Sequence, residues 1–341
     1  SFAGGRGRFF GTVESLYKEA IFLRDRDFSV TSNLAAVAPE PFNTLGGAFD
    51  ARTARGRYPI FRLGTATTSN YFRPVAGTPA LTTVAPTFAA NPEFYLDLNQ
   101  FGMASPRMAR ANSFFSAEYD LTKRITAFAD FSYYTADSTM VRQPLALNAP
   151  TTDKLATLSI DNPYNPYGSR FYSATGAANI DGSLRLTGAP RTVSLVSVTL
   201  PDLGVEKITT TANVIRFSSG VRGKLGDTWT WETSGFYNRV NGEDQAYPDV
   251  RESLLLKALQ GTDANAYNPF GYTFKVQNGA VVADKPYTNP AAVMDSFSAV
   301  FARQAESSLA SGELRVTGRL LRWWGGDIMA SFGGEYRKDT L

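Results

Sequence analysis

The feature that most constrains this chain is a period of two in side-chain polarity, seen most clearly over residues 113–134. In the second half of this stretch, apolar or small residues occupy alternate positions: Ile125, Ala127, Ala129, Phe131 and Tyr133. Successive side chains of a β-strand point to opposite faces of the sheet, so this spacing predicts strands rather than helices. The polar segment 120–123 interrupts the pattern and predicts the turn of a hairpin.

The same hairpin pattern occurs twice more. Residues 213–225 and 229–240 alternate around Gly-Asp, and residues 313–320 and 328–337 alternate around Trp-Trp-Gly-Gly-Asp. With a first strand expected over residues 9–23, the sequence predicts about seven strands. We therefore expect an all-β, antiparallel fold.

Long segments separate these strands: residues 24–110, 135–207 and 241–303. Unstructured connections of this length argue against a compact soluble domain, whereas a membrane barrel has long extracellular loops and short periplasmic turns. The repeated order of short turn, strand and long loop therefore favours a transmembrane β-barrel segment that covers residues 1–341. One short helix is expected within the third loop, over residues 250–259.

The composition narrows the function further. No window approaches 18 consecutive apolar residues, so a helical membrane span is excluded. The formal charge of +3 is too balanced to indicate a nucleic-acid partner. The chain contains neither histidine nor cysteine, which excludes Ser-His and Cys-His catalysis and any imidazole or thiolate metal ligand. We expect no enzymatic activity, no metal site and no cofactor.

The alternation assigns side chains to two faces of the expected sheet. Apolar positions are expected to face lipid: Ile125, Phe131, Ile215, Phe217, Trp229, Trp231, Val316 and Phe332. Interleaved charged positions are expected to line a wet lumen or contact a plug: Arg216, Arg222, Glu232, Glu313, Arg315 and Arg319. Alternation alone also fits a soluble sandwich, so the membrane assignment depends on the repeated order of turn, strand and loop.

Two Asn-Pro motifs stand out in the long segments, NPYNPYG at residues 162–168 and NPFG at residues 268–271. Asn-Pro initiates turns and glycine adopts positive φ, so each motif is expected to form a compact elbow that presents an aromatic ring. Loop aromatic residues are candidates for stacking on sugars or other planar ligands: Tyr164, Tyr167, Tyr172, Tyr247, Tyr267, Phe270 and Tyr272. Packing within the loops explains these rings equally well.

Four stretches, taken together, resemble the barrel of the bacterial TonB-dependent outer-membrane receptors. They are YDLTKRITAFADFSYY at 119–134, DNPYNPYG at 161–168, LGDTWTWETSGFYNR at 225–239 and FGGEYRKDTL at 332–341. The resemblance implies a location in the bacterial outer membrane, in contact with its lipid, and a barrel of about 22 strands closed by an N-terminal plug. It also implies uptake of a scarce small-molecule or oligosaccharide ligand with energy passed through the TonB system.

The chain departs from this pattern, because neither a plug nor the TonB-contact segment is recognisable and only about seven strands are expected. An open sheet leaves backbone groups unsatisfied in hydrocarbon, so the chain is expected to be a fragment or the ordered part of a longer receptor. Contact with TonB would then be made by the missing N-terminal part.

Two other functions stay open on the sequence alone. The chain could belong to a passive porin or structural outer-membrane barrel, in which case the complete gene would lack a plug and a TonB-contact segment. It could instead be a secreted β-rich carbohydrate-binding or adhesin module. That alternative predicts water solubility and a sandwich without a lumen.

Overall fold

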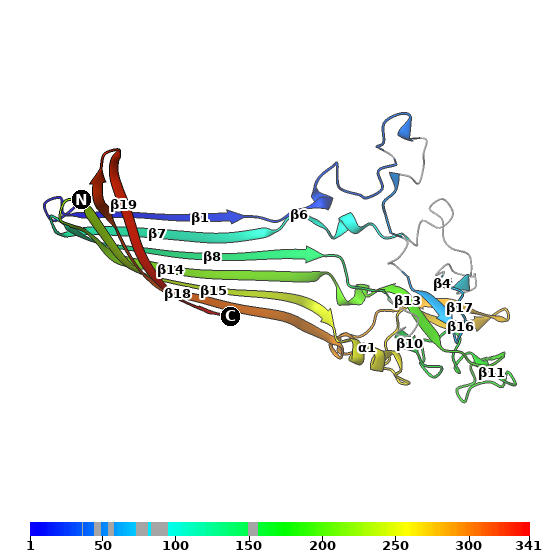
Figure 1. Ribbon diagram of the computed structural model, residues 1–341. Coiled ribbons are helices and arrows are strands. Elements are labelled where there is room, and N and C mark those ends of the chain that lie inside the picture. The colour runs from blue at the N-terminus through cyan, green and yellow to red at the C-terminus, as the bar shows by residue number, and fades with distance from the viewer. Residues whose placement is uncertain (36, 44–48, 54–57, 73–80, 83–94, 149–155) are drawn as a thin grey trace.

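The computed structural model describes residues 1–35, 37–43, 49–53, 58–72, 81–82, 95–148 and 156–341. The chain is all-β and mostly antiparallel, with 58% of its residues in strands and two short helices. A large sheet forms one half of the molecule, and most of the remaining segments gather at one end of its strands (Figure 1). The sheet is open, and no closed barrel forms among the described residues.

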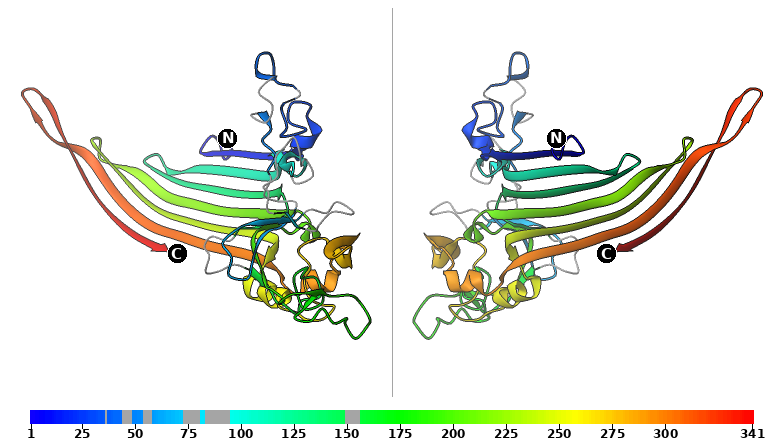
Figure 2. Two further views of the ribbon diagram at one scale, coloured as in Figure 1. Left: turned by 90° about the vertical axis from the view of Figure 1, so that its right-hand side faces the viewer. Right: turned by 90° about the vertical axis from the view of Figure 1, so that its left-hand side faces the viewer.

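Seven long strands make up the large sheet. In spatial order they are β1 (Gly7–Lys18), β7 (Arg107–Thr122), β8 (Ile125–Arg142), β14 (Glu206–Leu225), β15 (Trp229–Val250), β18 (Ser298–Trp323) and β19 (Gly326–Thr340). Every neighbouring pair is antiparallel, and β1 and β19 form the two edges. The strands curve along their length, and the β18–β19 hairpin extends furthest from the loop end (Figure 2).

Tight turns join the strands at one end of the sheet, and long connections join them at the other. The turns close the hairpins β7–β8, β14–β15 and β18–β19. In the β14–β15 turn, Gly226 has a φ of 62°, a conformation that a β-carbon disfavours. The three hairpins are those that the period-two pattern predicted. The second and third turns lie at the expected positions, whereas the first lies at residues 123–124, at the end of the expected segment 120–123.

The strands are longer than the alternation predicted. β8 continues eight residues beyond Tyr134 to Arg142, β15 continues to Val250, and β18 begins at Ser298. Consequently, both segments expected to be loops, 135–207 and 241–303, begin and end inside strands. Polar residues occupy both faces of these extensions, which removes the alternation while the backbone pairing continues.

The long connections fold into a compact unit at the end of the sheet, which we call the loop domain (residues 58–72, 144–148, 156–203 and 251–297). Its strands are β3 (Ile60–Leu63), β4 (Asn70–Phe72), β9 (Ala146–Asn148), β10 (Ala156–Leu158), β11 (Tyr172–Ser173), β12 (Leu186–Thr187), β13 (Val193–Thr199), β16 (Tyr272–Gln277) and β17 (Ala280–Pro286). β5 (Leu81–Thr82) extends the small sheet of this domain by pairing with β4, whereas the short strands β2 (Ile21–Phe22) and β6 (Met103–Ser105) pair with each other outside it.

The helices are short. In the loop domain α1 (Glu252–Leu259) coincides with the helix expected over residues 250–259, and α2 (Ala291–Asp295) precedes β18. Among the described residues, neither helix has the length and apolar character needed to cross a membrane.

The loop domain has a hydrophobic core of its own, built from segments far apart in the sequence. Phe61, Phe72 and Val193 come from its small sheet, Leu255 from α1, and Phe270 from the NPFG motif. The expectation that these connections are irregular is therefore wrong for their described parts. Residues 36, 44–48, 54–57, 73–80 and 83–94 of the first expected loop, and 149–155 of the second, lie outside the described residues.

Candidate functional site

The strand register divides the large sheet into two faces, because directly paired residues of antiparallel strands point to the same side. Phe217 pairs with Phe131 on β8 and with Tyr237 on β15, and we call their side the apolar face. Arg222 pairs with Glu232, which pairs with Arg315, and we call their side the polar face.

All eight residues expected to face lipid lie on the apolar face: Ile125, Phe131, Ile215, Phe217, Trp229, Trp231, Val316 and Phe332. All six residues expected at a lumen or plug lie on the polar face: Arg216, Arg222, Glu232, Glu313, Arg315 and Arg319. The register thus brings each set to one side of the sheet. What each side faces stays a prediction.

On three adjacent strands the apolar face is a band of limited height. The residues on this face are apolar or small at five alternate positions from Ile125 to Tyr133, six from Ile215 to Leu225 and five from Trp229 to Tyr237. These stretches span nine, eleven and nine residues of the chain. Beyond these limits, toward the loop domain, the same face carries polar residues: Thr135, Asn213 and Arg239. Aromatic rings mark both borders of the band on β15, with Trp229 at one and Tyr237 at the other.

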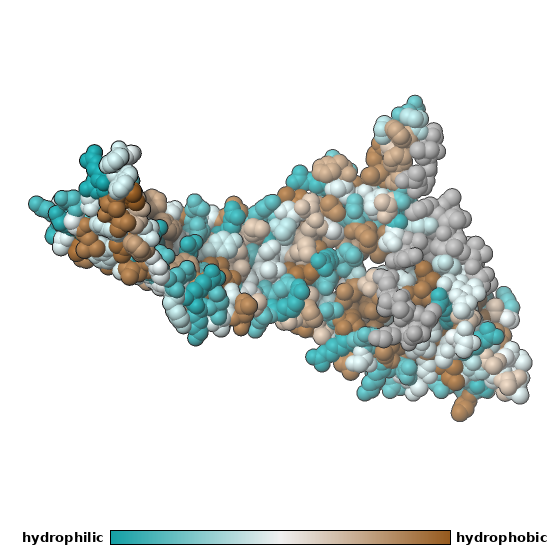
Figure 3. Space-filling model, viewed as in Figure 1, coloured by the Kyte–Doolittle hydropathy of each residue, from teal (hydrophilic) through white to brown (hydrophobic). Residues whose placement is uncertain are grey.

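Hydrophobic surface is also exposed at the tip of the sheet. Figure 3 shows it over the β18–β19 hairpin, where Leu320, Leu321, Ile328 and Met329 are exposed. On the apolar face nearby, the rings of Trp229 and Phe332 stack with centroids 6.4 Å apart. The sheet therefore presents packed but uncovered apolar side chains.

The polar face carries a network of charged and hydroxyl groups. Arg222 donates to Glu118 over 2.5 Å, Arg8 donates to the same carboxylate over 3.5 Å, and Ser234 donates to Glu313 over 2.9 Å. At the short-turn end lies a cavity of about 570 Å³, whose eleven lining residues include five cations: Lys123, Arg124, Arg222, Lys224 and Arg315. These side chains are solvated, so each ion pair contributes little to stability.

The loop aromatic residues do not form one exposed surface. Tyr267 and Phe270 are each 1% exposed and belong to the core of the loop domain. The loops fold around these two rings, which pack in the core and also line the cavity described below. Tyr247 lies apart from the other rings, on β15, and is 51% exposed.

The three tyrosines of the second connection are partly buried. The hydroxyls of Tyr164 and Tyr287 lie 2.6 Å apart, and the rings of Tyr167 and Tyr172 stack at 6.2 Å. Burial raises the pKa of Tyr164, Tyr167 and Tyr172, so all three phenols stay protonated at neutral pH. Their role in ligand binding stays a prediction.

Both Asn-Pro motifs form the compact turns expected from their residues. Asn162, Asn165 and Asn268 each accept a hydrogen bond from the backbone N–H two residues later, at 2.8–2.9 Å. Their amide groups reach distant backbone: Asn162 donates to the Leu259 carbonyl over 2.9 Å. Each motif thus ties its loop to the core rather than displaying a ring to solvent.

A second cavity, of about 460 Å³, lies beside the NPFG elbow. Residues from several connections line it, among them Tyr58, Leu96, Phe101, Pro144, Asp202 and Tyr272. Tyr267 and Phe270 line it too, and with Tyr272 they are the lining residues named from the sequence as ligand candidates. No spacing in the sequence links the others, because tertiary folding alone brings them together.

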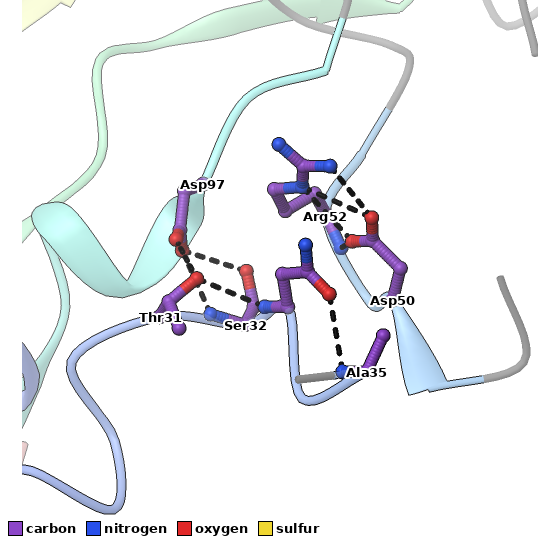
Figure 4. Close-up of polar contacts among 7 residues, drawn as sticks. Thr31, Ser32, Ala35, Asp50, Arg52 and Asp97 are labelled. Atoms are coloured by element: carbon purple, nitrogen blue, oxygen red, sulfur yellow. Dashed lines mark hydrogen bonds and ion pairs between the residues drawn. The ribbon is translucent and has the colours of Figure 1, made fainter. Parts of the chain in front are cut away.

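Hydrogen bonds to Asp97 hold together two distant parts of the first connection. The Asp97 carboxylate accepts hydrogen bonds from the Thr31 hydroxyl at 2.5 Å, the Ser32 hydroxyl at 2.7 Å and the Ser32 backbone N–H at 3.0 Å (Figure 4). Nearby, Arg52 and Asp50 form a two-pronged ion pair with a closest contact of 2.7 Å. The Asp97 contacts join segments separated by more than sixty residues, whereas the Asp50–Arg52 pair is local.

The Asp97 carboxyl and its neighbour are held ionised by these contacts. Burial favours the neutral form of Asp97, but the hydrogen bonds from Thr31 and Ser32 outweigh it and lower the pKa. The hydrogen bonds from Arg52 lower the pKa of Asp50 against a smaller effect of burial. Because both folded-state pKa values lie below the unfolded values, their stabilisation is complete above about pH 4 and disappears as the pH falls through the folded values.

We expect Asp97→Ala to destabilise this connection by about 1–3 kcal/mol, because it removes the acceptor of several hydrogen bonds. Hydrogen exchange of residues 29–33 at neutral pH should accelerate in the variant, and the difference from the wild type should shrink below about pH 4 as Asp97 becomes protonated. Asp27→Ala, an exposed carboxylate of the same segment, is the matched control. Equal exchange rates in both variants would contradict a stabilising role of the Asp97 hydrogen bonds.

Comparison of the chain with protein-family models, with curated proteins and with solved structures found no match. Among the described residues, no three acidic side chains come together as a metal-binding group.

Proposed function

We propose that this chain forms part of the wall of an outer-membrane β-barrel, in a receptor that captures ligand with its loop domain and takes it up with energy from the TonB system. The observation that carries the proposal is the height of the band on the apolar face. The stretches of β8, β14 and β15 over which every residue on this face is apolar or small span nine to eleven residues, which matches the 9–11 residues that a tilted strand needs to cross the hydrocarbon core.

The borders of the band support a membrane location. Trp229 lies at the short-turn border and Tyr237 at the loop-side border, and aromatic residues concentrate at both interfaces of membrane barrels. The opposite face of the same strands carries charged residues in a solvated network, as the interior of a water-filled barrel does. In a soluble sandwich the apolar face would be covered by a second sheet, and among the described residues none covers this one.

The arrangement of turns and loops supports a receptor role. All three hairpin turns lie at one end of the sheet, and the loop domain lies at the other (Figure 1). A folded domain with an internal cavity, held at the mouth of a barrel, is suited to capture a ligand before transport.

Cysteine labelling in intact cells tests the location sharply, because the chain contains no cysteine of its own. We expect Phe217→Cys in the complete gene product to resist a charged, water-soluble maleimide and to react with a lipophilic one. Ser218→Cys is the matched control. Ser218 follows Phe217 in the chain and points to the polar face, so a cysteine there should show the opposite preference for the two reagents. Equal reaction of both positions with the charged reagent, or a gene product that is soluble without detergent, would contradict a membrane location.

A further inference from the structure

The cavity beside the NPFG elbow has an uneven chemical character. Among the described residues that line it, Asp202 is the sole charged side chain. The surrounding walls are largely rings and aliphatic groups, including those of Tyr58, Phe101, Pro144 and Tyr272. A volume of about 460 Å³ is within the range of small-molecule sites.

One oxygen of the Asp202 carboxylate is fixed, and the other is open. Oδ2 accepts hydrogen bonds from the Asn289 backbone N–H at 3.2 Å and from its side-chain amide at 2.6 Å. Asn289 is itself held by Asn268, through two hydrogen bonds of 2.9 Å. In the described part of the chain, no hydrogen bond reaches Oδ1 and no lysine or arginine pairs with Asp202.

This arrangement favours a positively charged ligand. Asp202 is partly exposed and has no cationic partner among the described residues, so a positive ligand group supplies the ion pair that this carboxylate lacks. The aromatic faces of the cavity attract the same group through their negative π-surfaces. An anion is repelled, and a neutral saccharide leaves the charge unbalanced.

We propose that this cavity binds a small molecule that carries a cationic amine on an apolar body. Asp202 neutralises the amine through Oδ1, and the rings enclose the rest of the molecule. This inference adds a ligand class to the proposed function. Binding in the cavity does not require that function to be correct, but uptake of the bound ligand does.

Calorimetry on the detergent-solubilised complete protein tests the inference with benzyltrimethylammonium as the probe. Benzyl alcohol and benzoate serve as its neutral and anionic counterparts. We expect the cation to bind at least about tenfold more tightly than either, and Asp202→Asn to remove this preference. The asparagine retains an oxygen that can accept from Asn289, so the variant changes charge more than structure.

Asp161→Asn is the matched control, since Asp161 is an exposed carboxylate that accepts from Ser169 outside the cavity, and its cation binding should equal that of the wild type. Three results would overturn the inference. The wild type could bind all three probes with equal affinity, it could bind maltotriose more tightly than the cation, or the Asp202→Asn variant could keep the wild-type preference for the cation. The comparison of probes on the wild type is decisive even if the variant fails to fold. Loss of the cation preference with the labelling pattern of Phe217→Cys intact would remove this inference alone.

Discussion

Replacing Phe72 by alanine is expected to lower the free energy of unfolding of the loop domain by about 3–5 kcal/mol. The Phe72 side chain is 0% exposed, and its ring lies 5.5 Å from that of Phe270 and 5.7 Å from those of Tyr58 and Phe274. Truncation removes this contact area and leaves a cavity among rings from two separate connections. A domain of this size, with few long strands, has little further stability to compensate.

The distribution of tryptophan allows this effect to be measured separately from the sheet. All four tryptophans lie in the large sheet or its β18–β19 turn, so tryptophan fluorescence reports the sheet. Eight of the 16 tyrosines lie in the loop domain, so near-ultraviolet circular dichroism of tyrosine reports the loop domain as well as the sheet. In denaturant titrations, Phe72→Ala should shift the tyrosine transition and leave the tryptophan transition in place. Phe28→Ala, whose side chain is 81% exposed, should change neither by more than about 0.5 kcal/mol. A tyrosine transition that does not move in Phe72→Ala would refute a common core.

Replacing Phe217 by arginine is expected to destabilise the membrane-inserted protein by about 2–4 kcal/mol. Phe217 lies within the band on the apolar face, between Phe131 and Tyr237, so a cation there would have to enter hydrocarbon or distort the bilayer. Urea titration of the complete protein folded in phospholipid vesicles measures the difference.

The adjacent position provides the comparison. Ser218→Arg places the same side chain on the polar face, where it would lie near Asp130, the carboxylate to which Ser218 now donates over 3.3 Å. We expect this variant to stay within about 1 kcal/mol of the wild type. Similar losses at both positions would show that the two faces meet the same surroundings.

The hairpins could be predicted from the sequence because each strand meets two different environments at alternate positions. Phe217 and Arg216 belong to opposite faces whatever the rest of the chain does, so a local pattern is sufficient. The same reasoning failed beyond Val240, where β15 continues to Val250 with polar residues on both sides. Backbone hydrogen bonds hold that extension in the sheet, and the polarity of the side chains does not reveal where such bonds form.

The fold of the loop domain could not be predicted from the sequence, for a different reason. Its core joins Phe61, Leu158, Leu255 and Phe270, which lie in four separate segments, and no periodicity connects them. The Asn-Pro turns could be foreseen because proline and asparagine act on their own backbone. That Phe270 points into a core, and that Asp202 lies by a cavity, follows from long-range packing that local patterns do not encode.

The number of strands in the open sheet has a consequence for any closed form of it. Five strands separate β1 from β19, and each is antiparallel to its neighbours, so the two edges run in the same direction. Joined directly, they would have to pair in parallel. A ring that keeps antiparallel neighbours throughout must therefore be completed by an odd number of additional strands.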